Sequence, residues 1–216
     1  MRSLLVFGAL VAVTAAPAMA QEVSVSGNVS IVSDYQWRNL TQSNYDWTVQ
    51  GGLDLEFSNG FYLGTWASGV DFQDEPEDTN LEIDFYGGYA FALGGLDASG
   101  GFVYYTYPDA GTADLNFLEI NGTLSKTWEN FTLGGSLNWD PDNETLYGDL
   151  AGSLALTEAF SLSAGYGTWF EGLGEYSGWN FGGTLSFGGI DFGLTYYDND
   201  ISGNDSNIVF SIGRTM

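Results

Sequence analysis

Residues 46–72 read DWTVQGGLDLEFSNGFYLGTWASGVDF, two runs of alternating apolar and polar side chains joined by Asn59-Gly60. An Asn-Gly pair between alternating runs is typical of a two-residue hairpin turn. If Ser58 pairs with Phe61, the apolar side chains of both runs share one face. The predicted pairs include Phe57 with Tyr62 and Leu53 with Trp66. The stretch therefore predicts a β-hairpin with one apolar face and one small, polar, partly acidic face.

The same alternation repeats along the chain, from Val23 to the last run around Ile212. Very short connections, such as Gly94-Gly95 and Gly188-Gly189, alternate with longer polar loops. Each run has roughly ten residues, which suits a tilted membrane-spanning strand better than the shorter strands of soluble sheets. We therefore predict an all-β protein, a transmembrane antiparallel up-and-down β-barrel of about 12 strands with short periplasmic turns and longer extracellular loops.

Aromatic residues of the apolar faces form two bands along these runs, as lipid interfaces select. The first predicted strand runs from Val23 to Arg38, and a polar loop follows at 39–45. The band near the short turns comprises Phe57, Tyr62, Phe91, Phe131, Phe160, Phe187 and Phe192. The band near the longer loops comprises Tyr35, Trp37, Trp47, Phe72, Trp139, Trp179 and Tyr196. The separation of the aromatic residues into one band near the short turns and another near the longer loops favours a membrane barrel over a soluble sandwich.

The N-terminus has the pattern of a secretory signal peptide. Arg2 precedes an apolar run, and Ala18-Met19-Ala20 forms a small-x-small cleavage site. We predict removal of residues 1–20, a mature barrel of residues 21–216, and a location in the bacterial outer membrane.

Charge and composition exclude several classes of function. Without Arg2, three basic residues stand against 28 acidic ones, a net charge of −25. This balance argues against nucleic acid or anionic lipid as a partner, because both require clustered Lys and Arg. The chain has no Cys and no His, so it has neither disulfides nor the commonest acid/base group. We predict no enzymatic activity and no cofactor.

The polar faces are expected to point into the barrel, where their charges are mostly negative. The residues predicted to line a pore are Asp34, Arg38, Asp54, Glu56, Asp71, Glu82, Asp84, Tyr105, Glu119, Asp149 and Asp191. Two interpretations stay open. Arg38 facing carboxylates would shape a narrow channel, whereas a side-chain network would fill the lumen and conduct little. Small residues on the polar faces favour the channel, because they leave space.

Three acidic loops are suited to hard cations, and the third resembles the start of a calcium loop. It reads D-x-D-x-S-G from Asp198, but Val209 occupies the place of the closing bidentate Glu. The candidate metal ligands there are Asp198, Asp200 and Asp205. An acidic loop without a bound metal is the simpler interpretation.

From about Ser33 to Glu119 the sequence resembles the TorF family of porin-like proteins. The matching positions are Asp34-Tyr35, Arg38, Gln42-Ser43, Gln50-Gly51-Gly52, Gly60-Phe61-Tyr62, Val70-Asp71-Phe72, Asp84, Tyr86-Gly87-Gly88-Tyr89, Tyr105, Tyr107-Pro108 and Glu119. The resemblance implies an outer-membrane barrel of undefined substrate. Asn39 stands where that family usually has Gly, and Met216 stands where outer-membrane barrels usually end in an aromatic residue.

Two functions follow as hypotheses. The first is a narrow channel for passive diffusion of small solutes or ions, with a preference for cations and with outer-membrane lipid as its surroundings. The second is a non-conducting structural or adhesive barrel whose acidic loops bind cations.

Overall fold

The computed structural model describes residues 23–73, 79–171 and 176–216. The predicted signal peptide, residues 1–20, lies outside the described residues. Within them every regular element is a β-strand, and no helix is long and apolar enough to cross a membrane. The strands are β1 (Val23–Val32), β2 (Gln36–Trp37), β3 (Leu40–Thr41), β4 (Thr48–Phe57), β5 (Phe61–Gly69), β6 (Leu81–Leu93), β7 (Leu96–Thr106), β8 (Phe117–Trp128), β9 (Phe131–Asp140), β10 (Thr145–Ala155), β11 (Phe160–Glu171), β12 (Ser177–Phe187), β13 (Ile190–Asn199) and β14 (Asn207–Thr215).

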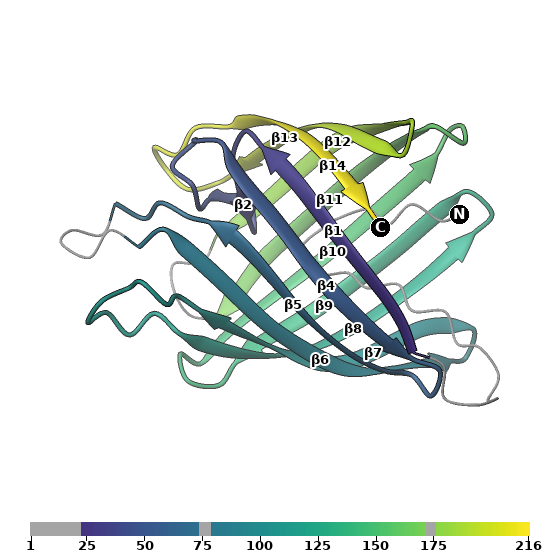
Figure 1. The fold of residues 1–216 in the computed structure, drawn as a ribbon, viewed down its shortest axis with the longest axis horizontal. Coiled ribbons are helices and arrows are strands. Elements are labelled where there is room, and N and C mark those ends of the chain that lie inside the picture. Colours follow the sequence, from purple (N-terminus) through teal and green to yellow (C-terminus); the bar gives the residue numbers. More distant parts are fainter. Residues whose placement is uncertain (1–22, 74–78, 172–175) are drawn as a thin grey trace.

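Twelve of the described strands close into one antiparallel barrel, which confirms the predicted fold. Each strand pairs with its neighbours in the chain, and β1 closes the ring by pairing with β14 and, across the β2–β3 insertion, with β4. Short turns gather at one end of the barrel and longer connections at the other (Figure 1). We call these the short-turn end and the long-loop end. Closure satisfies the backbone hydrogen bonds of every strand in the ring without leaving an open sheet edge.

The glycine pairs form the turns that the sequence predicted. Leu93 pairs with Leu96 across Gly94-Gly95, and both glycines have positive φ, at 60° and 84°. A two-residue hairpin whose central residues both have positive φ matches the twist of its strands. Gly188-Gly189 does the same at the β12–β13 turn.

The register predicted for the β4–β5 hairpin is wrong by one residue. Glu56, not Phe57, pairs with Tyr62, because residues 58–60 form a three-residue turn in which Gly60 has φ 96° and donates to the Phe57 carbonyl at 2.9 Å. A slip of one residue exchanges the two faces of a strand. Tyr62 and Trp66 therefore point into the barrel, and Phe61 and Leu63 point outward.

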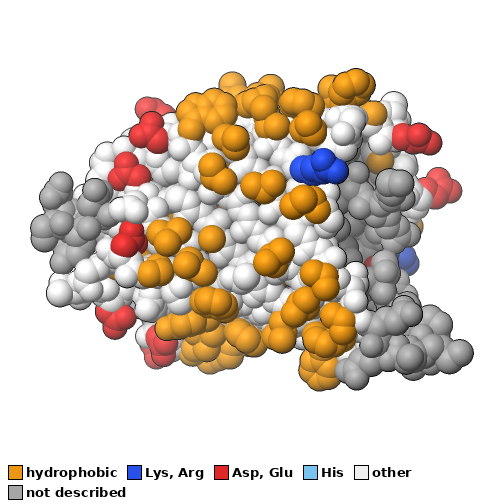
Figure 2. Space-filling view, viewed as in Figure 1, with side chains coloured by type: hydrophobic (Ala, Val, Ile, Leu, Met, Phe, Trp, Pro, Cys, Tyr) orange, Lys and Arg blue, Asp and Glu red, His pale blue; other side chains and the backbone are white. Residues whose placement is uncertain are grey.

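Large hydrophobic side chains are exposed around the outer face of the barrel, and Figure 2 shows many of them on one side of it. Exposed aromatics lie towards both ends, as predicted, including Phe91 and Phe187 near the short turns and Trp47 and Trp139 near the longer loops. Three members of the predicted long-loop band are corrected. Tyr35, Trp37 and Phe72 pack inside the barrel, because the chain leaves the wall at both places where they lie.

The predicted first strand is too long. It ends at Val32, and the chain then turns into the barrel and forms the β2–β3 hairpin before it rejoins the wall at β4 (Figure 1). We call residues 33–47 the lumenal segment. Its polar and aromatic side chains meet the inner faces of the strands at the long-loop end.

Candidate functional site

The lumenal segment is the candidate functional site, because it crosses the lumen at the long-loop end. Its tip is a tight hairpin in which Trp37 pairs with Leu40. The two turn residues, Arg38 and Asn39, have φ of 52° and 64°. Asn tolerates this left-handed conformation better than most residues, and Gly adopts it freely. Asn39 therefore satisfies the backbone requirement that Gly would meet at this position.

Asp34 organises the base of the lumenal segment. Its carboxylate accepts hydrogen bonds from Thr41 Oγ1 at 2.6 Å, from Ser43 Oγ at 2.9 Å and from the Gln36 amide. Asn207 on β14 donates to the same carboxylate at 2.6 Å. Asp34 is buried, so these donors replace the water that a carboxylate requires. The acid thus fixes the segment to itself and to the barrel wall.

Arg38 links the lumenal segment to the opposite wall of the barrel. Its Nη2 atom lies 2.7 Å from both carboxylate oxygens of Glu119 on β8, and both side chains are buried. Three rings surround the guanidinium, whose central carbon lies 4.2 to 4.6 Å from the ring centroids of Trp37, Tyr147 and Trp169. Such rings favour a desolvated cation. The charge of Arg38 is therefore matched within the site.

A second buried carboxylate, Glu82 on β6, holds two phenols. Tyr35 Oη and Tyr107 Oη each donate to it at 2.7 Å. Burial raises the pKa of Tyr35 and of Tyr107 well above the usual value for a phenol, and the nearby charge of Glu82 raises both further. Both phenols therefore stay protonated at neutral pH and serve as donors. They join the lumenal segment and the β7–β8 loop to the wall.

The β11–β14 side of the wall receives the hairpin tip. Asn180 donates to Asn39 Oδ1 at 3.0 Å, and Asn199 donates to the Asn39 carbonyl at 2.7 Å. A Cβ atom on Gly178 would lie 2.6 Å from Asn39, so the absence of a side chain there allows the close approach. The tip therefore contacts β12 and β13 while Arg38 contacts β8.

Four buried polar atoms around this layer have no hydrogen-bond partner in the described part of the chain. They are Arg38 Nη1, Asp84 Oδ1, Trp169 Nε1 and Asn180 Oδ1. Buried polar atoms are nearly always satisfied by protein or by water. The packing around the lumenal segment is thus polar and incompletely paired.

The structure brings most of the predicted pore residues into this layer. Asp34, Arg38, Glu82 and Glu119 belong to it directly, Tyr105 donates to Glu119 at 3.2 Å, and Asp84 lies opposite Tyr105 on β6. Asp71 accepts a hydrogen bond from Asn44 Nδ2 at 3.3 Å, so a residue outside the lumenal segment also holds it in place.

The other predicted pore residues lie on inner faces outside this layer, and among them Asp149 is close enough to Arg38 to interact with its charge. Asp54 accepts from Tyr86, Asp149 from Ser136 and Asp191 from Ser186. Glu56 lies two residues from Asp54 on the same face of β4. These four acids are only partly buried. Besides the phenols of Tyr62 and Tyr86, which lie next to Glu56 and Asp54, their surroundings towards the short-turn end are small and polar, including Ser99, Thr123, Ser125, Thr132, Ser153, Ser161 and Thr184.

The acidic loop at β13–β14 makes protein contacts instead of forming a cluster of ligands. Asp198 accepts from Tyr196 at 3.1 Å, and Asp200 accepts from the Ser177 amide at 2.8 Å. Among the described residues, no group of three or more His, Cys, Asp or Glu side chains is placed to hold a metal ion, so Asp198, Asp200 and Asp205 form no such cluster.

Sequence reasoning missed the aromatic partners of the site. Tyr147 and Trp169 surround Arg38, and Trp66 packs against Tyr35 with ring centroids 5.3 Å apart. Continued alternation in β10 and β11 would have placed Tyr147 and Trp169 on the polar face. Trp66 was missed because of the one-residue error in register.

Comparison with solved structures finds porins. The KdgM porin has a TM-score of 0.62 over 88% of this chain and 96% of that chain, at 7% identity. A KdgM structure in complex with a disordered oligogalacturonate gives a TM-score of 0.61 with the same coverage and identity. The NanC porin gives 0.58 over 89% of this chain and 98% of that chain, at 11% identity. At these identities the likeness shows a shared porin-like fold alone.

Sequence comparison identifies the family. None of the curated proteins matches the chain. The narrower resemblance to the TorF family stays a prediction. The family model Gcw_chp, described as a bacterial protein of unknown function, matches residues 15–211, so the chain belongs to this family.

Proposed function

We propose that the protein is an outer-membrane channel for passive diffusion of small solutes or ions, with a preference for cations and with its constriction at the lumenal segment. The observation that carries the proposal is the closed barrel with an apolar outer face and a polar lumen crossed by this segment. An apolar wall suits lipid, and a polar lumen suits water. The short turns would face the periplasm and the longer loops the exterior.

A hydrated path past the segment is supported by the four unpartnered polar atoms around it. Water is the ordinary partner of such atoms when protein supplies none. Towards the short-turn end, Ser and Thr dominate the inner faces and leave space. We therefore place the narrowest part of the path beside Arg38, with a wider vestibule below it.

Cation preference follows from the balance of inner charges. Arg38 is paired with Glu119, whereas Asp54, Glu56 and Asp191 have no cationic partner in the described residues. A narrow bore with low-dielectric walls strengthens the field of such acids. Selectivity should weaken as pH falls and the carboxylates take up protons.

An acidic oligosaccharide is not the substrate that this lumen suggests. The related fold of KdgM was solved with an oligogalacturonate, but a polyanion requires free inner cations. Among the described residues, Lys126 and Arg214 lie on outward-facing positions and Arg38 is neutralised. Small neutral solutes or cations are the better candidates. Because the chain has no His and no Cys, the proposal includes no catalytic step and no cofactor.

One observation favours the second function, a non-conducting barrel. The lumenal segment contacts β8 through Glu119 and β12 through Asn180, so it reaches across the lumen. If no ion passes it, the protein would be structural or adhesive. Conductance of the purified protein in a planar lipid bilayer separates the two functions. Discrete channels are expected, and a barrel that inserts without conducting would contradict the channel.

Selectivity is tested by the reversal potential under a shallow KCl gradient near neutral pH. The salt concentration is kept well below 1 M, because at 1 M the Debye length is only about 3 Å and the field of the inner acids is screened. We expect cation selectivity in the native protein and a clear loss of it when Asp54→Asn and Glu56→Gln are combined. The matched control combines Glu129→Gln and Glu158→Gln, which remove the same charge from exposed turns. An anion-selective native channel, or equal reversal potentials in all three proteins, would exclude control by these inner acids.

A further inference from the structure

Arg214 lies on the outer face of the barrel, on the side of the wall away from the lumen. It pairs with Val29 across the β1–β14 seam, and Val29 and Ile212 present exposed apolar side chains. Figure 2 shows a basic side chain among the apolar ones of this face. Arg214 is exposed, and within the described part of the chain its side chain forms no ion pair or hydrogen bond. A charged side chain on a lipid-facing wall needs a partner from outside the protein.

Arg214 also lies well above the short-turn end. From its partner Val29, strand β1 continues to Val23. With a rise of about 3.3 Å per residue and a tilt of about 45°, this stretch spans about 14 Å along the barrel axis. An ionisable side chain at such a depth is unfavourable in hydrocarbon and marks a functional position by default. Its long stem allows the guanidinium to reach towards the headgroup layer.

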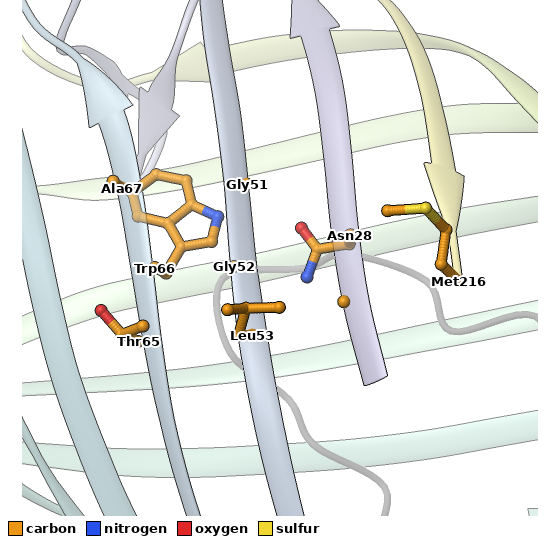
Figure 3. A pocket seen from close by; sticks show the side chains of 9 residues that line it. Asn28, Gly51, Gly52, Leu53, Thr65, Trp66, Ala67 and Met216 are labelled. Atoms are coloured by element: carbon orange, nitrogen blue, oxygen red, sulfur yellow. The ribbon is translucent and has the colours of Figure 1, made fainter. Parts of the chain in front are cut away.

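A hollow of about 320 Å³ lies on the same outer face, and its lining includes Met216, two residues beyond Arg214. Its outward-facing lining comes from neighbouring strands, as Figure 3 shows, and comprises Gly27, Gly51, Leu53, Thr65, Ala67 and Met216. Gly51 lies opposite Val29, which is the partner of Arg214. A Cβ on Gly51 would lie 2.7 Å from the Asn28 carbonyl oxygen, so the floor of the hollow is held free of side chains. The surface beside the arginine is therefore concave and mainly apolar.

We propose that Arg214 and this hollow bind an anionic glycerophospholipid, with the phosphate on the guanidinium and a stretch of acyl chain in the hollow. The inference rests on the proposed location in a membrane. A guanidinium donates two parallel hydrogen bonds to phosphate, and an apolar hollow receives methylene groups. From its depth in the wall, the long side chain of Arg214 would extend towards the short-turn end, where the phospholipid headgroups of the periplasmic leaflet would be.

The negative net charge of the chain restricts the binding of anionic lipid to the surroundings of Arg214. The net charge, −24 for the whole chain and −25 without the predicted signal peptide, repels anionic lipid from the acidic ends of the barrel, so Arg214 acts alone and does not belong to a basic patch. Nine residues line the hollow, whereas a stable protein interface takes about 20–30 residues from each partner. The hollow therefore suits a lipid chain better than a second copy of the protein.

The test is native mass spectrometry of the purified full-length mature protein, released from neutral detergent to which phosphatidylglycerol or phosphatidylcholine has been added. The native protein should retain phosphatidylglycerol preferentially. Arg214→Gln should lower that retention about tenfold, as expected for loss of a charge-assisted contact. Ala67→Phe should also lower it, because the new ring fills the hollow while the arginine stays. Lys126→Gln removes the other outward base and should leave retention unchanged.

Three outcomes would overturn the site. Equal retention by the native protein and Arg214→Gln would show that the arginine holds no lipid, and equal losses in Arg214→Gln and Lys126→Gln would show non-specific attraction. Lipid-free dimers that disappear in Ala67→Phe would assign the hollow to a protein interface. Gel migration before and after boiling shows whether each variant forms the closed barrel. A native protein that conducts ions but retains no phosphatidylglycerol overturns this site alone, whereas one that never inserts overturns the channel as well.

Discussion

The two ends of the barrel interior differ, although the same alternation of side chains builds both. At the long-loop end, Asp34, Glu82 and Glu119 are buried and hydrogen-bonded, and aromatic rings pack around them. At the short-turn end, Asp54 and Glu56 are only partly buried, and small hydroxyl side chains line the wall. The difference arises from the lumenal segment, which enters one end only. Under the proposed function, the acids beside the segment hold structure, whereas the partly exposed acids below it meet ions.

Removal of the β2–β3 hairpin should have the largest effect on this difference between the two ends. The backbone N–H of Gln42 donates to the Tyr35 carbonyl at 2.7 Å, so replacing residues 36–41 with Asn-Gly should close the segment above the lumen. We expect single-channel conductance to rise several-fold, because Trp37 and Arg38 leave the lumen. The control replaces the exposed turn 141–144 with Asn-Gly, since Asp140 and Thr145 are already paired. Unchanged conductance in the first variant would show that the segment does not limit ion flow.

The ion pair between Arg38 and Glu119 offers the next largest effect. Removing one partner of a buried pair typically costs about 3–5 kcal/mol. Arg38→Met and Glu119→Gln should each lower the free energy of unfolding by roughly that amount, and the double variant should lose less than the sum. The measurement is urea unfolding in detergent, followed by gel migration.

The same cycle on Ser186→Ala and Asp191→Asn, at the short-turn end, supplies the comparison. There the carboxylate is partly exposed, so each loss should be no more than about 1 kcal/mol. Equal losses at both ends would contradict the division of the lumen into a structural layer and an open vestibule.

Strand alternation and turn chemistry were enough to predict the barrel. The Gly94-Gly95 and Gly188-Gly189 turns have the predicted register, and the acids of β6 and β8 point inward. These features are local, because positive φ in a turn and a period of two along a strand depend on neighbouring residues only.

The lumenal segment could not be predicted in the same way. Tyr35 and Trp37 continue the alternation of β1, so the sequence favoured a longer strand. The chain leaves the wall because Asp34 and Arg38 find partners on distant strands, at Asn207 and Glu119. Such long-range pairing overrides local strand preference. The β4–β5 register failed for a smaller reason, because Asn59-Gly60 fits both a two-residue and a three-residue turn.

A single added methyl group tests how closely the hairpin tip packs against the wall. Gly178→Ala would place a Cβ 2.6 Å from Asn39, whereas Gly100→Ala would meet nothing closer than 3.9 Å. Overpacking of this kind costs about 1–3 kcal/mol. We expect Gly178→Ala to lower the free energy of unfolding by that amount and to raise conductance as the tip shifts. A stability loss no larger than that of Gly100→Ala would mean that the tip is loosely held.

The smallest effect is expected at the turn of the hairpin itself. Asn39 and Glu129 both have positive φ, at 64° and 47°, but only Asn39 has a side-chain partner across the lumen, Asn180 at 3.0 Å. For an ordinary residue the left-handed conformation costs about 1–2 kcal/mol, part of which is offset by the greater backbone freedom that Gly loses on folding. Glu129→Gly should therefore stabilise the barrel by up to about 1 kcal/mol.

Asn39→Gly should not stabilise it, because Asn is less strained in this conformation and the lost hydrogen bond is worth about 1 kcal/mol. Urea unfolding of the two variants side by side gives the sign of each change. If Asn39→Gly stabilised the protein as much as Glu129→Gly, the contact between the hairpin tip and β12 would contribute nothing to stability. The tip would then be free to move in the lumen, and the difference between the two ends of the barrel would be one of average position and not of fixed structure.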